Sequence, residues 1–106
     1  MRIPKFRHLD ERNRKIWWHD IRGNRRDVFI EDEITLIPSN NKKKVICLQK
    51  LVFPKEKHRW ELRLCYYMIG VKGKTKGKWV YGQFAPLLPA KDFKAIFNKA
   101  EKKGWI

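Results

Sequence analysis

The strongest constraint on the fold is an alternation of side chains between residues 59 and 69. Every second position is apolar or aromatic: Trp60, Leu62, Leu64, Tyr66 and Met68. The positions between them are mixed: Arg59, Glu61, Arg63, Cys65, Tyr67 and Ile69. A period of two is typical of a β-strand with one face on a core. We therefore expect a strand whose first set of side chains faces a core, with the second set on the opposite face.

Three further segments have strand-like patterns: residues 28–37, 44–53 and 78–84. The last of them follows a connection, residues 70–77, whose three glycines suit the bends of a hairpin. A short apolar run over residues 16–21, closed by a glycine-containing turn, precedes the other segments. Together these patterns predict an antiparallel sheet of three to five strands.

Residues 89–103 have the pattern of an amphipathic helix, with apolar side chains at Phe93, Ile96, Phe97 and Ala100. Asp92 suits the positive end of the helix dipole, and Gly104 suits the left-handed residue that ends many helices. Trp105 is then expected to fold back on the last turn. The sequence therefore predicts an α+β fold. We expect residues 1–106 to form a single small domain, an antiparallel sheet with the C-terminal helix packed on one face.

The charge balance restricts the class of partner. The chain has 26 Lys and Arg against 11 Asp and Glu, a net charge of +15 at pH 7, with a pI near 10.2. Such an excess opposes compaction by self-repulsion, which a bound polyanion relieves. A pI above about 9 in one small domain is typical of nucleic-acid-binding proteins. The alternative is a basic protein whose charge only keeps it in solution.

The charges are unevenly distributed along the chain. The net charge is +6 over residues 1–26, −4 over residues 27–40 and +13 over residues 41–106. We expect the acidic island to lie away from a bound anion, or to pair with the basic segments inside the protein; it consists of Asp27, Glu31, Asp32 and Glu33. Residues 1–15 are interpreted as a basic N-terminal arm, or as a strap held down by Ile3, Phe6 and Leu9.

Cys47 and Cys65 are the only cysteines, and each lies within an apolar run, which favours buried thiols. The chain has no metal-binding spacing and no Gly-rich phosphate loop, so we expect neither a metal nor a cofactor. The N-terminal residues lack the apolar segment of a signal peptide, and no apolar run has membrane-spanning length. We therefore expect a cytoplasmic protein with no membrane partner.

The candidate interface combines cations with aromatic rings. Rings flanked by guanidinium groups on an open sheet face suit single-stranded nucleic acid, because bases stack on the rings while arginines hold phosphates. The connection 70–78 adds a lysine at every second position, and an arginine cluster precedes the acidic island. The predicted nucleic-acid-binding residues are Arg22, Arg25, Arg26, Arg59, Arg63, Tyr67, Lys72, Lys74, Lys76, Lys78, Trp79 and Tyr81.

Each of these groups has a structural alternative. The lysines of the connection also suit a solvated turn, since lysines at a sheet edge block aggregation. The arginine cluster is also suited to neutralisation by the acids that follow it. The aromatic set is also consistent with a second small core beneath the N-terminal segment, where other rings find burial: Phe6, Trp17, Trp18, Tyr67, Trp79 and Tyr81.

The function that these features predict is nucleic-acid binding with low sequence specificity, to DNA or RNA. The first alternative is a metal-free, toxin-like ribonuclease, in which a histidine takes a proton and a cation stabilises the phosphate; the histidines are His8, His19 and His58. Nothing in the sequence brings two such groups together, so a binding protein is favoured over an enzyme and no catalytic residue is assigned. The other alternative is a protein-interaction subunit of a nucleoprotein or mobile-element assembly. It would dock on a protein, or on a second copy, through exposed aromatic side chains such as Trp17 and Trp18.

Overall fold

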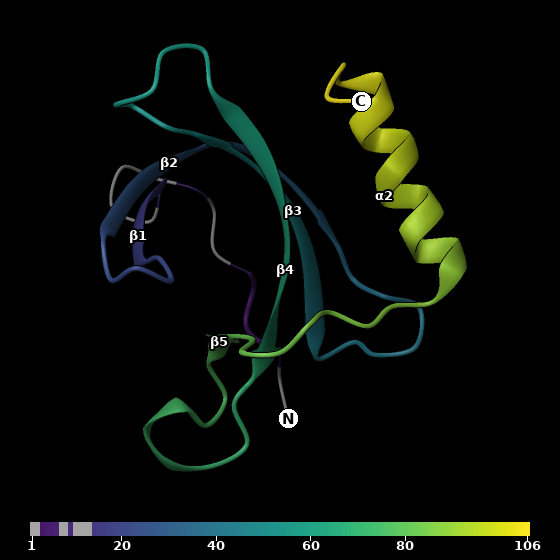
Figure 1. Cartoon of the computed structure of the whole chain (residues 1–106). Helices are drawn as coiled ribbons and strands as arrows, with labels where there is room; N and C mark the ends of the chain where they lie inside the picture. The colour runs from purple at the N-terminus through teal and green to yellow at the C-terminus, as the bar shows by residue number, and fades with distance from the viewer. Residues whose placement is uncertain (1–2, 7–8, 10–13) are drawn as a thin grey trace.

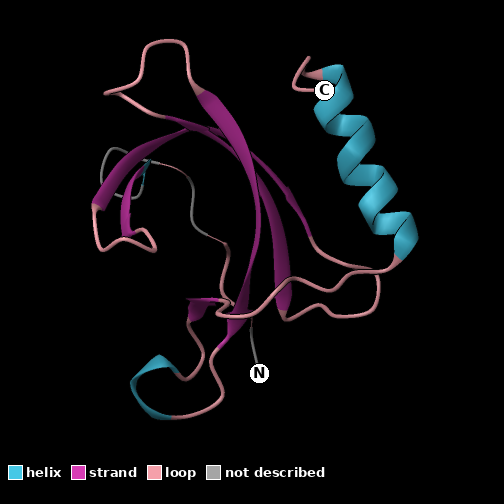
Figure 2. Ribbon diagram, viewed as in Figure 1, coloured by secondary structure: helices cyan, strands magenta, loops and turns pink. Residues whose placement is uncertain are grey.

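The structure of the protein is a computed structural model that describes residues 3–6, 9 and 14–106. Five antiparallel strands form a curled sheet in the order β1-β2-β3-β4-β5, and one helix, α2, packs on it (Figures 1 and 2). The elements are β1 Lys15–His19, β2 Arg25–Leu36, β3 Lys44–Val52, β4 Trp60–Ile69, β5 Trp79–Tyr81 and α2 Ala90–Lys102. The predicted α+β fold is thus confirmed.

The face of the sheet that α2 covers, here called the helix face, carries one of two apolar layers. Ile96 packs with Ile46 and Tyr66, and Ala100 packs with Ile34 and Trp105. The predicted core-facing set of β4 lies on this face, yet only its centre is covered. Tyr66 is buried and its neighbours Leu62 and Leu64 are half-buried, whereas Trp60 and Met68 are exposed at the two ends of the strand.

The opposite face, here called the N-terminal face, is closed and not open as expected. Phe6 packs against the cluster of Val45, Cys47, Cys65 and Tyr67, so these side chains are buried on a second core. A third cluster on the same face packs under Leu9 and consists of Val28, Ile30, Leu51 and Phe53. The described residues of the expected N-terminal arm therefore behave as a strap. The prediction that both cysteine side chains are buried is confirmed.

Both ends of α2 are tied to their surroundings. Buried Asp92 accepts hydrogen bonds from the backbone N–H and the hydroxyl of Ser39, both at 3.0 Å, which joins the helix start to the β2–β3 connection. At the other end Gly104 has a φ of 75°, and the N–H of Trp105 bonds the carbonyl of Ala100 at 3.0 Å. Trp105 is buried against the last turn, as predicted. Within the described residues, no helix combines the length and apolarity needed to cross a membrane.

Candidate nucleic-acid interface

Two lysine-rich connections lie side by side at one end of the sheet. The backbone N–H of Ile69, the last residue of β4, donates a hydrogen bond to the carbonyl of Lys43 at 3.1 Å. Lys44 at the start of β3 pairs with Met68. The β2–β3 and β4–β5 connections are therefore neighbours, both toward the bottom of Figure 1. We name this surface the lysine end; it consists of Lys42, Lys43, Lys72, Lys74, Lys76 and Lys78.

The β4–β5 connection is closed by its own backbone. The N–H of Gly70 bonds the carbonyl of Lys78 at 2.8 Å, and the N–H of Gly77 bonds the carbonyl of Gly70 at 2.9 Å. A single 3-10 turn, Gly73–Thr75, fills the middle. The lysines are thus presented on a compact loop, so little backbone order remains to be gained when an anion binds.

The lysine end carries positive charge that no described residue neutralises by an ion pair. All six lysines are exposed. None of them forms an ion pair with another residue in the part of the chain that the structure describes. Neighbouring like charges add their potentials and attract a polyanion from solution. This end of the sheet is therefore a surface that should attract anions.

Three of the predicted arginines, Arg25, Arg26 and Arg59, face carboxylates. Arg25 pairs with Asp27 at 2.9 Å, and Arg26 pairs with Asp20 at 3.1 Å. Arg22 is exposed in the β1–β2 turn. Arg59 contacts two acids, and its hydrogen bonds to the carboxylates first of Glu61 and then of Glu56 raise its pKa. Arg59 lies in the β3–β4 turn, at the opposite end of β4 from the lysine end.

The predicted arginine–aromatic sheet face is largely a packed interior. Nε and Nη2 of Arg63 donate to the side-chain oxygen of buried Gln49, at 2.9 and 2.6 Å, and its guanidinium lies 5.2 Å from the ring of Tyr81. Phe6 lies edge-on to the rings of Tyr67 and Trp79, at 5.1 and 5.5 Å.

Exposure separates Tyr81 from the other two rings of this set. Tyr67 is buried, and the indole N–H of half-buried Trp79 donates to the carbonyl of Pro4 at 2.9 Å. Tyr81 is 43% exposed, so only this ring of the predicted set has a large accessible surface. The expectation of an open platform is thus corrected, because a described part of the N-terminal segment covers it.

Sequence reasoning missed Lys42 and Lys43, which share the lysine end with the predicted loop. The signal was present as three consecutive lysines directly after a turn, but their neighbourhood depends on the β3–β4 register. Of the histidines in the ribonuclease alternative, His19 lies in β1 and His58 in the β3–β4 turn, while His8 lies outside the described residues. Among described residues, no group of three or more His, Cys, Asp or Glu side chains has a metal-binding arrangement.

Comparison with known proteins finds no matching family model, curated protein or solved structure. Functional conclusions therefore depend on the chemistry of the surface itself. That surface is a cluster of point cations, and lysine binds phosphate in this way without a directional, base-reading geometry.

Proposed function

We propose that this protein binds nucleic acid through the lysine end, with low sequence specificity. The observation that carries the proposal is that six exposed lysines lie on two connections at the same end of the sheet, without an ion pair to any described residue. A polymer of phosphates supplies many anions at once, so it matches such a cluster better than a single small anion does. The net charge of +15 adds a long-range attraction for the same partner.

Low specificity follows from the kind of side chain. Contacts to phosphates position a protein on nucleic acid, whereas contacts to base edges specify a sequence. The six lysines of this surface offer ammonium groups, which pair with phosphates as point charges and do not form two hydrogen bonds to one base edge. DNA and RNA are both partners that this chemistry accepts.

The test is the salt dependence of oligonucleotide binding. Changing Lys72, Lys74 and Lys76 together to alanine should weaken binding and flatten the plot of log affinity against log salt. Each phosphate contact contributes a slope of roughly −0.7 to −0.9, so three lost contacts should remove about 2 to 3 units. Fluorescence anisotropy with a labelled 20-mer between about 50 and 200 mM salt measures both quantities.

A matched control removes the same charge elsewhere. Lys55, Lys57 and Lys99 are exposed and lie away from the β4–β5 connection, in the β3–β4 turn and on α2. Their joint replacement by alanine should leave the slope close to that of the unchanged protein. If both triple variants lose the same slope, binding is spread over the whole surface and the lysine end has no special role. If the unchanged protein does not bind at low salt, the proposed function is wrong.

A further inference from the structure

The part of the helix face that α2 leaves uncovered carries exposed aromatic rings. The strand register places four side chains in one row across the sheet: Lys15, Phe29, Val52 and Trp60. Trp17 lies two residues along β1 from Lys15, so it shares this face. The rings differ from those of the core in exposure, since Trp17 is 56% and Trp60 41% accessible. We name Trp17, Phe29 and Trp60 the aromatic face.

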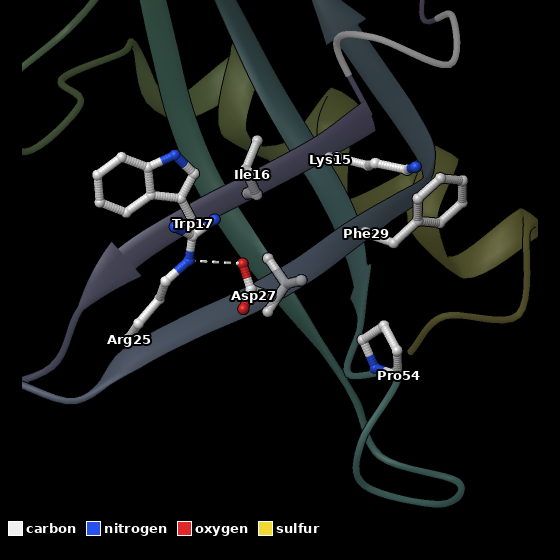
Figure 3. A pocket seen from close by; sticks show the side chains of 8 residues that line it. Lys15, Ile16, Trp17, Arg25, Asp27, Phe29 and Pro54 are labelled. Carbon is white, nitrogen blue, oxygen red and sulfur yellow. Dashed lines mark hydrogen bonds and ion pairs between the residues drawn. The ribbon is translucent and has the colours of Figure 1, made fainter.

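A pocket of about 330 Å³ lies between Trp17 and Phe29. Figure 3 shows the two rings on either side of it, with Asp27 between them and Pro54 below Phe29. The volume is at the lower end of the range of small-ligand sites. Its walls are mostly apolar, with the ammonium of Lys15 and the guanidinium of Arg25 at the rim. Such a pocket suits a flat, apolar group that is attached to an anion.

Each ring of the aromatic face carries one cation. Arg25 lies 4.7 Å from the ring of Trp17, Arg14 lies 5.8 Å from Phe29, and the ammonium of Lys50 lies 4.6 Å from Trp60. Arg25 is held there by its ion pair with Asp27 at 2.9 Å. Protein–protein interfaces are enriched in aromatic rings and arginine but depleted of lysine, so it is Lys15 and Lys50 beside these rings that suit a single strand better than a protein. The chemistry of this face thus favours nucleic acid over a protein partner.

We infer that the aromatic face binds unpaired nucleobases, with one base in the pocket stacked on Trp17 and the adjoining phosphate near Lys15, which has no ion pair with a described residue, whereas Arg25 is paired with Asp27. The inference rests on the proposed function and narrows it to single-stranded DNA or RNA. In a duplex the faces of the bases are covered by their neighbours, so they cannot stack on a side chain. Arg25 occupies one side of the indole, and the accessible remainder of the ring receives the base.

The experiment separates bases from phosphates. We use an oligothymidine 20-mer and an abasic 20-mer, which has the same sugar–phosphate charge but no bases. The unchanged protein should bind oligothymidine more tightly than the abasic strand. Trp17→Ala should weaken oligothymidine binding by about 5- to 150-fold, the equivalent of about 1–3 kcal/mol for one stacked base, and leave abasic binding unchanged. Trp17→Leu should behave like Trp17→Ala, because it keeps an apolar side chain but loses the ring.

Phe84 supplies the matched control, since it is 79% exposed and does not line this pocket. Phe84→Ala should bind both strands as the unchanged protein does, and circular dichroism should show all three variants folded. Equal affinity of the unchanged protein for the two strands, or an equal loss for both in Trp17→Ala, overturns the inference while leaving the lysine-end proposal intact. Absence of binding to both strands overturns the proposed function itself.

Discussion

Gln49 joins a carboxylate to a guanidinium on the N-terminal face of the sheet. Its side chain is fully buried, and its amide nitrogen donates to the carboxylate of Glu33 at 2.6 Å. Its oxygen accepts two hydrogen bonds from Arg63. The three residues lie on neighbouring strands β2, β3 and β4 in direct register. Because both charged partners are half-buried, the glutamine supplies hydrogen bonds that replace part of their contact with water.

Replacing Gln49 by methionine should destabilise the fold. Methionine keeps the length and volume of glutamine but neither donates to Glu33 nor accepts from Arg63, so two charged groups lose a hydrogen-bond partner. Leaving a buried polar group unsatisfied costs about 1–3 kcal/mol. Urea denaturation measures the loss, and Gln83→Met, at an exposed glutamine outside the network, is the control. A Gln49→Met variant as stable as the control would show that the network contributes nothing to stability.

The sequence was informative about side-chain burial where an apolar run surrounds a residue. Cys47 and Cys65 are the example, since both lie among apolar neighbours and both are buried. Tyr67 was expected on an open face because its own parity also contains Arg63 and Glu61. Its burial depends on Phe6, which lies 61 positions earlier in the chain. Contacts of this kind leave no periodic signal, so sequence reasoning gave the packed-core reading only as an alternative.

At the scale of the elements, the β1–β2 turn is organised by one carboxylate. Oδ1 of Asp20 accepts hydrogen bonds from the backbone N–H groups of Asn24 and Arg22, both at 2.9 Å, and Oδ2 accepts from Nε of Arg26 at 3.1 Å. The bond from Asn24 contributes most to lowering the pKa of Asp20 below its ordinary value of 3.8, followed by the bonds from Arg22 and Arg26. The ionised carboxylate therefore stabilises the turn from which Arg25 reaches Trp17.

The stability that Asp20 supplies should depend on pH. A carboxyl group with a lower pKa in the folded than in the unfolded protein stabilises the fold above its unfolded pKa. That contribution is lost as pH falls through the folded pKa. In Asp20→Asn, the amide oxygen keeps the backbone bonds but does not titrate. The difference in Tm between the unchanged protein and Asp20→Asn should therefore shrink as the pH falls from about 5 to about 2. A difference that stays constant over this range would contradict the assignment, and an NMR titration of the Asp20 carboxyl carbon measures the pKa directly.

Most elements were predictable from sequence because their signals are local. Alternation placed β4 to within one residue, and the pattern of apolar positions placed α2 within Pro89–Lys103. Strand β5 has only three residues and is shorter than the expected segment 78–84. The N–H of Gly82 still bonds the carbonyl of Tyr66, but after this residue the chain turns away from the sheet toward α2. Strand β1 was visible only as a short apolar run. Its five residues depend on pairing with β2, which no local pattern specifies.

At the scale of the whole molecule, most of the described acidic side chains form ion pairs with particular cations. Asp20, Asp27 and the two acids around Arg59 pair with arginines, while Glu31 and Asp32 pair with Lys50 and Lys103. Three of the four acids of the acidic island therefore pair with cations of the protein itself, which was one of the two expectations for the island. The lysine end receives none of these partners among the described residues. Its lysine loop was predictable from the sequence, but its junction with the β2–β3 connection required the fold.

Repulsion within the lysine end should make the stability of the protein depend on salt. The Debye length falls from about 30 Å at 0.01 M to about 10 Å at 0.1 M salt, and the molecule measures 45 × 34 × 26 Å. Lysines on one small surface are therefore poorly screened at the lower concentration. We expect Tm to rise with added sodium chloride, by roughly 4–8 °C for each kcal/mol by which screening reduces the repulsion between the lysines.

Two variants of equal net charge locate the source of that repulsion. Changing Lys74 and Lys76 to glutamate, or Lys55 and Lys57 to glutamate, lowers the charge of +15 by four units in either case. The first pair lies among lysines that have no ion pair with a described residue, so the new carboxylates gain favourable neighbours and should raise Tm at low salt. The second pair flanks Glu56, so its carboxylates meet an acid and should raise Tm less. Thermal unfolding in about 0.01 M salt compares them, and both differences should fade as screening increases. Equal Tm values for the two variants would mean that only the total charge matters and that no strained cluster exists at the lysine end.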